Sequence, residues 1–150
     1  MPTTKPGAAA EHLLFDALDA LKMGDVQPWV NMFQDDGVME FPYAPAGGHT
    51  RLDGKAAIAE YLKPYPERIS IKRVIRRAVY HCGDVMVAEF ACESTAVPTG
   101  NQFEMNYVAI VTVKNGKIKH YRDYWNPLVA IQAFGGLEAL TKQVTAEPKA

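Results

Sequence analysis

The chain has 150 residues, of which 48% are hydrophobic and 22% are charged. This is the size and composition of one globular domain with a sizeable core, and it excludes a wholly disordered chain. The formal net charge of -1 gives no reason to expect nucleic acid or an anionic membrane as a partner. Two cysteines, Cys82 and Cys92, are too few for a disulfide framework or a zinc site.

The segment Met1–Ala10 does not have the pattern of a secretory signal. No apolar run follows a basic start, as in a secretory signal, and no apolar stretch approaches the ~18 residues of a membrane span. We therefore expect a cytoplasmic protein. Residues 1–8 are predicted to be a flexible N-terminal tail, residues 9–136 a single domain, and residues 137–150 a C-terminal tail.

The first part of the chain has the apolar period of helices. Leu14, Leu18 and Leu21 recur at helical spacing. Similar spacing bounded by capping or breaking residues predicts three helices, over residues 9–23, 25–33 and 55–62. A turn at residues 35–37 and a short strand over residues 38–43 are expected between the second and third helices.

From residue 68 onward the apolar period changes to two, as in β-strands. Four successive strands are predicted, over residues 68–80, 84–96, 102–114 and 117–125, followed by a helical turn over residues 127–134. Helices first and antiparallel strands afterwards predict the α+β class. We expect a cone-shaped, curved antiparallel sheet wrapped around three N-terminal helices, as in a cystatin-like α+β barrel, with a pocket at its open end.

The segment His120–Pro127 is the most informative one for function. Side chains alternate along a strand, so Tyr121, Asp123 and Trp125 share one face. A carboxylate between two aromatic side chains on an inner face would be desolvated, which raises its pKa toward neutral pH. Asp123 is therefore a candidate general acid or base. The alternative is that Asp123 pairs with an Arg or Lys, or lies on the solvent face.

Two stretches of the sequence resemble one protein superfamily. Lys22–Pro42 is similar to the opening of ketosteroid isomerase and its relatives, and Asn115–Trp125 is similar to their last hairpin. These relatives form the SnoaL-like, or nuclear transport factor 2-like, superfamily. The resemblance runs from about residue 13 to residue 128. It implies a conical α+β fold with the pocket inside the cone, usually as a homodimer through the outer face of the sheet.

The same resemblance argues against ketosteroid isomerase activity itself. The position of that enzyme's base is occupied by Phe41, and its oxyanion-binding tyrosine would fall near Ala17. Its protonated aspartate would fall near Val108 or Ala109. None of these side chains can replace the missing group.

Other branches of the superfamily match the last strand better. The run Arg122–Pro127 is similar to a run in phenazine-biosynthesis proteins whose acid is catalytic, which implies that role for Asp123. SnoaL-type polyketide cyclases likewise use an acid in this pocket. Limonene-epoxide hydrolase needs a second Asp and an Arg on the neighbouring strand, which here offers only Glu89 and Glu93. Whether Glu89 faces the pocket is left open by the sequence, since both faces of its strand are apolar.

The sequence thus predicts a SnoaL-like pocket protein that performs acid/base catalysis, of the isomerase, cyclase or condensation type. The substrate would be a small hydrophobic carbonyl or aromatic metabolite. Asp123 would be catalytic, and the predicted substrate-binding residues are Trp29, Phe41, His49, Tyr107, Tyr121 and Trp125. No cofactor and no metal are implied, because no cluster has metal-ligand spacing. The alternatives are a non-catalytic protein of the same fold that binds a hydrophobic ligand or a protein partner, and an epoxide-hydrolase-like enzyme.

The long strands also predict an assembly. Val85 and Val87 alternate with Met86 and Phe90, so both faces of one strand are apolar. An antiparallel sheet with one face in water would alternate apolar with polar residues instead. We therefore expect the outer face to be covered by a second copy, as a homodimer.

Overall fold

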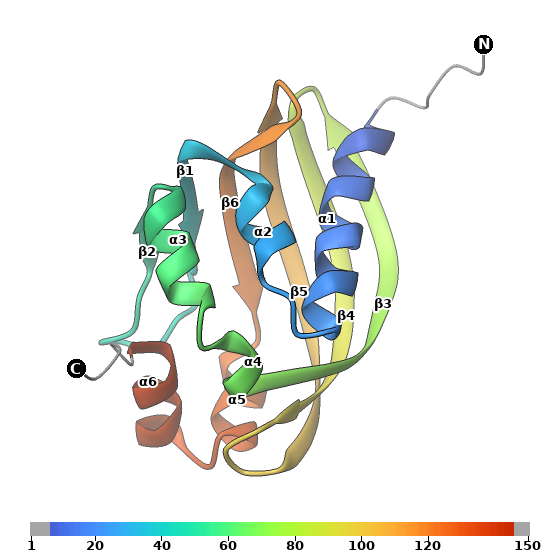
Figure 1. Ribbon diagram of the computed structural model, residues 1–150. Coiled ribbons are helices and arrows are strands. Elements are labelled where there is room, and N and C mark those ends of the chain that lie inside the picture. The colour runs from blue at the N-terminus through green and yellow to red at the C-terminus, as the bar shows by residue number, and fades with distance from the viewer. Residues whose placement is uncertain (1–6, 146–150) are drawn as a thin grey trace.

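Helices lie on the concave face of a strongly curved sheet in the computed structural model, which describes residues 7–145 (Figure 1). The helices are α1 (Ala8–Lys22), α2 (Gln27–Asn31), α3 (Lys55–Leu62), α4 (Tyr65–Arg68), α5 (Pro127–Ala133) and α6 (Leu137–Thr145). The strands are β1 (Phe33–Glu40), β2 (Arg51–Asp53), β3 (Ile69–Cys82), β4 (Val85–Ala96), β5 (Asn101–Lys114) and β6 (Lys117–Trp125). Of the expected tails, residues 1–6 and 146–150 lie outside the described residues.

The six strands form one sheet in the order β2-β1-β6-β5-β4-β3. The predicted α+β class and curved sheet are confirmed. The sheet is mixed, however, and not purely antiparallel, because β1 pairs in parallel with β6, with Met39 opposite Tyr121. No tight turn joins these two strands, so the connection does not force them to run in opposite directions. The sheet does not close into a barrel, since β2 and β3 are its edges.

The four long strands begin and end within two residues of their predicted limits. The main difference is at residues 35–37, which were expected as a turn and instead lie within β1. The pairing of β1 with β6 shifts register between Phe33 and Val38. A Cβ atom at Gly37 would lie 3.0 Å from the carbonyl oxygen of Gln34 and 3.1 Å from that of Ile118. Glycine therefore allows the two backbones to approach at this irregularity.

The C-terminal segment differs from the expected tail, because residues Leu137–Thr145 form α6. Leu140 is buried and packs in a small apolar cluster with Ala130 and Ala133 of α5 and with Phe134, which follows that helix. Gly135 and Gly136 both have positive φ and separate the two helices. Leu137, Leu140 and Val144 do recur at helical spacing, so the sequence carried a signal for this helix.

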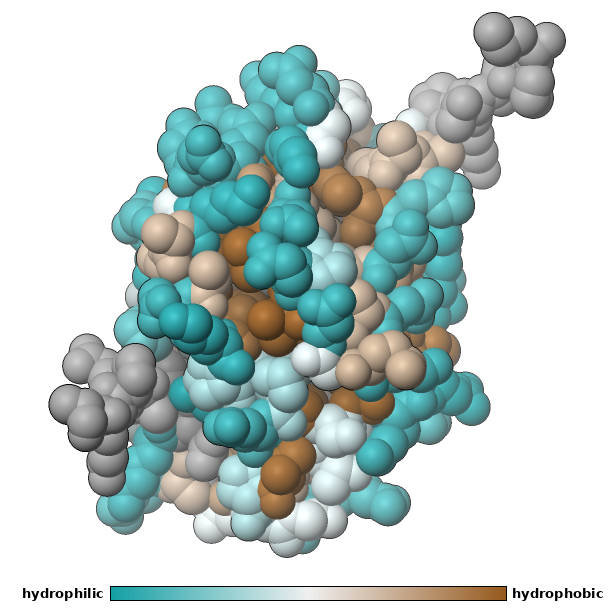
Figure 2. All heavy atoms as spheres, in the orientation of Figure 1, coloured by the Kyte–Doolittle hydropathy of each residue, from teal (hydrophilic) through white to brown (hydrophobic). Residues whose placement is uncertain are grey.

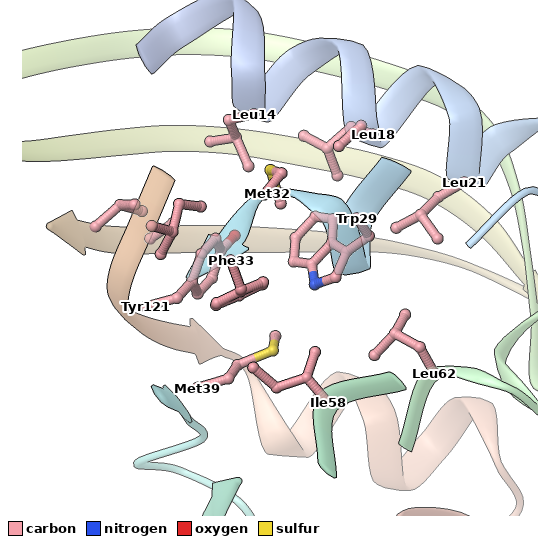
Figure 3. Packing of buried hydrophobic residues seen from close by; sticks show 14 of the residues in the cluster. Leu14, Leu18, Leu21, Trp29, Met32, Phe33, Met39, Ile58, Leu62 and Tyr121 are labelled. Carbon is pink, nitrogen blue, oxygen red and sulfur yellow. The ribbon is translucent and has the colours of Figure 1, made fainter. Parts of the chain in front are cut away.

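The core lies between the helices and the concave face of the sheet. Figure 3 shows side chains from α1, α2 and α3 meeting those of β1 and β6, among them Leu14, Trp29, Ile58, Met39 and Tyr121. In Figure 2, apolar side chains come to the surface between α2 and α3, framed by polar ones. Burial of this cluster supplies the driving force that holds the helices on the sheet.

An ion pair cluster attaches α1 to β3. Glu11 contacts both Arg76 and His81, and its Oε2 lies 2.6 Å from Nε2 of His81. The hydrogen bond with His81, with a further contribution from Arg76, holds the pKa of Glu11 below its usual value. Arg76 also lies over the ring of Phe15, 4.8 Å from its centroid.

Within residues 7–145, no helix combines the length and apolarity that crossing a membrane requires.

We expect Leu14→Ala to lower the free energy of unfolding by about 2–5 kcal/mol, because Leu14 is fully buried and its removal leaves a cavity. The matched control is Leu128→Ala, whose side chain is 74% exposed and should change stability by less than about 0.5 kcal/mol. Urea denaturation of both variants measures the difference. Equal stabilities would contradict the packing of α1 described above.

Candidate functional site

A cavity of about 130 Å³ lies between the helices and the concave face of the sheet. Its walls are largely apolar and come from elements far apart in the sequence. The helical side includes Leu18, Leu21, Trp29, Tyr61 and Leu62, and the sheet side includes Met39, Phe90, Tyr107, Tyr121 and Trp125. Such a hollow, with few polar groups, is the usual form of a small-molecule site.

The structure brings most of the predicted site residues together. Asp123 lines the cavity, and so do five of the six predicted substrate-binding residues, namely Trp29, Phe41, Tyr107, Tyr121 and Trp125. His49 is exposed and is outside the set of described residues that line the cavity. Its ring makes an edge contact with Tyr61, at 5.8 Å between centroids, and Tyr61 does line the cavity. A direct role of His49 in substrate binding stays a prediction.

Asp123 is placed on the concave face by the alternation of β6. Its backbone pairs with Ala109 of β5. Its Oδ1 atom is excluded from solvent and accepts no hydrogen bond from the described residues. No Lys, Arg or His among residues 7–142 forms an ion pair with it. Burial raises the pKa of Asp123 to about 7.

Four tyrosines around the cavity keep their protons at neutral pH. Burial raises the pKa of Tyr61 to about 12 and raises the pKa of Tyr65, Tyr107 and Tyr121 well above its usual value. The charge of Asp123 adds to the shift in each case. These hydroxyl groups therefore act as neutral hydrogen-bond donors or acceptors and not as bases.

Two further polar side chains line the cavity without having been predicted. Burial, with a smaller effect of the Asp123 charge, raises the pKa of the Cys92 thiol to about 12, so it is not a thiolate nucleophile. Arg68, at the end of α4, is half-buried, and burial lowers the pKa of its guanidinium. The sequence could have predicted that Cys92 faces the same way as Phe90, because the two residues are two positions apart on one strand. No pattern in the sequence points to the four-residue helix that places Arg68.

Glu89 and Glu93 do not reach the cavity. Phe90 and Cys92 line it, so the alternating Glu89 and Glu93 lie on the opposite, outer face of β4. This settles the orientation of Glu89, which the sequence left open. The second acid that an epoxide-hydrolase-like mechanism would take from this strand is therefore on the wrong side of the sheet.

Helices over a curved sheet, with an apolar cavity between them that Asp123 lines, define the conical α+β class. The family model "SnoaL-like domain" matches residues 15–121, and the chain belongs to this family. The superfamily resemblance of the sequence is thereby confirmed.

Known proteins similar to the chain carry few functional names. The chain is 40% identical over 114 residues to the "Uncharacterized protein YesE" of Bacillus subtilis, covering 75% of this chain and 78% of that protein. It is 34% identical over 137 residues to the "Uncharacterized PhzA/B-like protein PA3332" of Pseudomonas aeruginosa, covering 90% and 96%. Among solved structures, a "Putative Isomerase from Bacillus subtilis" superposes with a TM-score of 0.85 at 35% identity, covering 89% of this chain and 98% of that one.

The burial of Asp123 predicts an unusual dependence of stability on pH. The carboxyl pKa is about 7 in the folded state and ~3.9 in the unfolded state, so the folded state binds more protons between these values. The free energy of unfolding should therefore fall as pH rises from about 4 to about 7, by at most ~4 kcal/mol, and then level off. Asp123→Asn should remove this part of the dependence, and denaturation at several pH values measures it.

The control for this experiment is Asp19→Asn, which changes an exposed side chain of α1. It should keep the fall in stability between pH 4 and pH 7. If Asp123→Asn and the wild type had the same pH dependence, Asp123 would not be desolvated as described.

Proposed function

We propose that the chain is an acid/base catalyst in which Asp123 moves a proton on a small hydrophobic carbonyl or aromatic compound. The observation that carries the proposal is the lone carboxyl group in the apolar cavity, whose Oδ1 atom has no partner among the described residues. A buried polar atom without a partner is costly, and it is typical of a site that a ligand completes.

The proton chemistry follows from the surroundings of this carboxyl group. Near neutral pH the carboxylate and the acid of Asp123 are both populated, so the group can take a proton from carbon and return it elsewhere. Taking and returning one proton needs no second reactant, which favours isomerisation or ring closure. The protonated hydroxyl groups of Tyr61, Tyr65 and Tyr107 are suitable donors for the negative oxygen that forms on a carbonyl compound.

Two of the similar proteins support this class of reaction. One solved structure carries the name "Putative Isomerase from Bacillus subtilis", and the Pseudomonas aeruginosa relative carries the name "Uncharacterized PhzA/B-like protein PA3332". The alternative of a non-catalytic binding protein uses the same cavity but requires no proton transfer. Ligand binding alone therefore does not distinguish the catalyst from the binding protein, whereas proton transfer on the bound ligand does.

Deuterium exchange provides the test. Acetophenone in D2O should exchange its methyl protons faster with the protein present, and the rate should change with a single inflection near pH 7. We expect Asp123→Asn to reduce the exchange rate about 100- to 10,000-fold, as measured by proton NMR. Glu89→Gln is the control and should keep the rate, because Glu89 lies on the outer face of β4.

The outcomes distinguish the alternatives. Exchange that survives Asp123→Asn would show that another group transfers the proton. Binding of acetophenone without any accelerated exchange would favour the non-catalytic reading of the cavity.

We also propose that the chain forms a homodimer through the outer face of its sheet. Val108, near the middle of β5, lies beside Glu89 of β4 and Tyr124 of β6, and its side chain is 37% exposed. Ile110, next on the same face, is opposite Arg122, whose buried Nε atom has no partner among the described residues. A self-complementary partner would cover the apolar side chains of this face.

Light scattering at low micromolar concentration tests the dimer. We expect about twice the chain mass of 16.6 kDa, and an interface of this kind should bury upward of ~1,000 Å². Val108→Glu should shift the mass toward 16.6 kDa, because it places a charge at the centre of the face. A wild-type species of 16.6 kDa would contradict the dimer.

A further inference from the structure

A second polar atom of the cavity has no partner in the described part of the chain. Four buried side-chain atoms lack a hydrogen bond there, namely Trp29 Nε1, Ser94 Oγ, Arg122 Nε and Asp123 Oδ1. Only Trp29 and Asp123 belong to the cavity wall. Besides Asp123, the indole N–H of Trp29 is therefore the group in this set that a ligand in the cavity could satisfy.

The orientation of Trp29 places this donor toward the cavity. The side chain is 5% exposed, and its ring packs against Tyr121 with 5.3 Å between the ring centroids. Figure 3 shows the indole nitrogen on the edge of the ring that is turned toward Met39 and Leu62, both of which line the cavity. A buried indole N–H normally has a partner. Phenylalanine would fill much of the same space without leaving a donor unpaired.

The chemistry of the donor limits the group that it can bind. An indole N–H donates only, and it stays neutral at all pH values of interest. Its partner must be an acceptor, such as a carbonyl, ether or hydroxyl oxygen. Asp123, which both donates and accepts near neutral pH, would meet a different part of the same ligand.

The size of the cavity limits the ligand further. Its volume is about 130 Å³, and an apolar protein cavity of ~150 Å³ holds one benzene molecule. Along β6, Asp123 lies two residues beyond Tyr121, which is about 7 Å of strand. Trp29 packs on Tyr121, and Tyr121 and Asp123 share one face of β6 and both line the cavity, so one ligand in this cavity can meet both Trp29 and Asp123.

We infer that the indole N–H of Trp29 binds the hydrogen-bond acceptor of a ligand with a single ring and turns the reacting part of that ligand toward Asp123. Trp29 is then a positioning residue, and the substrate class is a monocyclic compound with an oxygen acceptor. This inference rests on the proposed function for the identity of the reacting end, but binding through Trp29 is measured separately from proton transfer.

The experiment compares two probes of similar shape, acetophenone and ethylbenzene, of which only acetophenone has an acceptor. On binding acetophenone, the indole Nε1–H signal of Trp29 in 15N-labelled protein should move downfield, and ethylbenzene should not produce this shift. Trp29→Phe should weaken acetophenone binding roughly 2- to 12-fold, the contribution of one neutral hydrogen bond, and leave ethylbenzene binding unchanged. Ser94→Ala is the control, because its unpartnered Oγ belongs to a residue outside the cavity wall, and it should bind both probes as the wild type does.

Several results would overturn the inference. These are an unmoved indole signal, equal loss of both probes in Trp29→Phe, and failure of the wild type to bind acetophenone at millimolar concentration. Binding of the two-ring ketone 2-acetonaphthone as tightly as acetophenone would overturn the size limit. Asp123→Asn separates the two proposals: it should keep the indole shift with acetophenone even where it abolishes proton exchange.

Discussion

The Oδ1 atom of Asp123 is excluded from solvent in the folded chain, and it receives no hydrogen bond from the described residues in return. Desolvation of a charge is among the most costly events in folding, and the group responds by keeping its proton to higher pH. This single cost explains why the cavity contains a group that can exchange protons near neutral pH.

The fold supplies that wall from both ends of the chain. Parallel pairing of β1 with β6 sets Met39 opposite Tyr121, and both side chains line the cavity. The register shift at Gly37 belongs to the same pairing. At the other end of the chain, α6 contributes Leu140, which is buried and also lines the cavity. The site is therefore assembled from segments that have no sequence relation to one another, and its polar atoms are few because most of the wall belongs to the hydrophobic core.

The sequence was sufficient to predict the features that follow from the local spacing of apolar residues and from turn residues. The four long strands, the helix over residues 55–62 and the inward face of Asp123 all follow from such patterns. Long-range pairing and short elements could not be predicted in this way. The three residues of β2 are too few for a period, and nothing local specifies that β1 runs parallel to β6. That the indole nitrogen of Trp29 lacks a hydrogen-bond acceptor could not be predicted either, because it follows from the packing of distant segments around the ring.

The most direct measurement is an NMR titration of the side-chain carboxyl carbon of Asp123, with the signal assigned by its loss in Asp123→Asn. We predict a midpoint near pH 7, because burial raises the pKa of Asp123 to about 7. A midpoint near pH 4, the value of a hydrated aspartate, would show that water or an unseen partner solvates the carboxylate. It would contradict the central role given to desolvation.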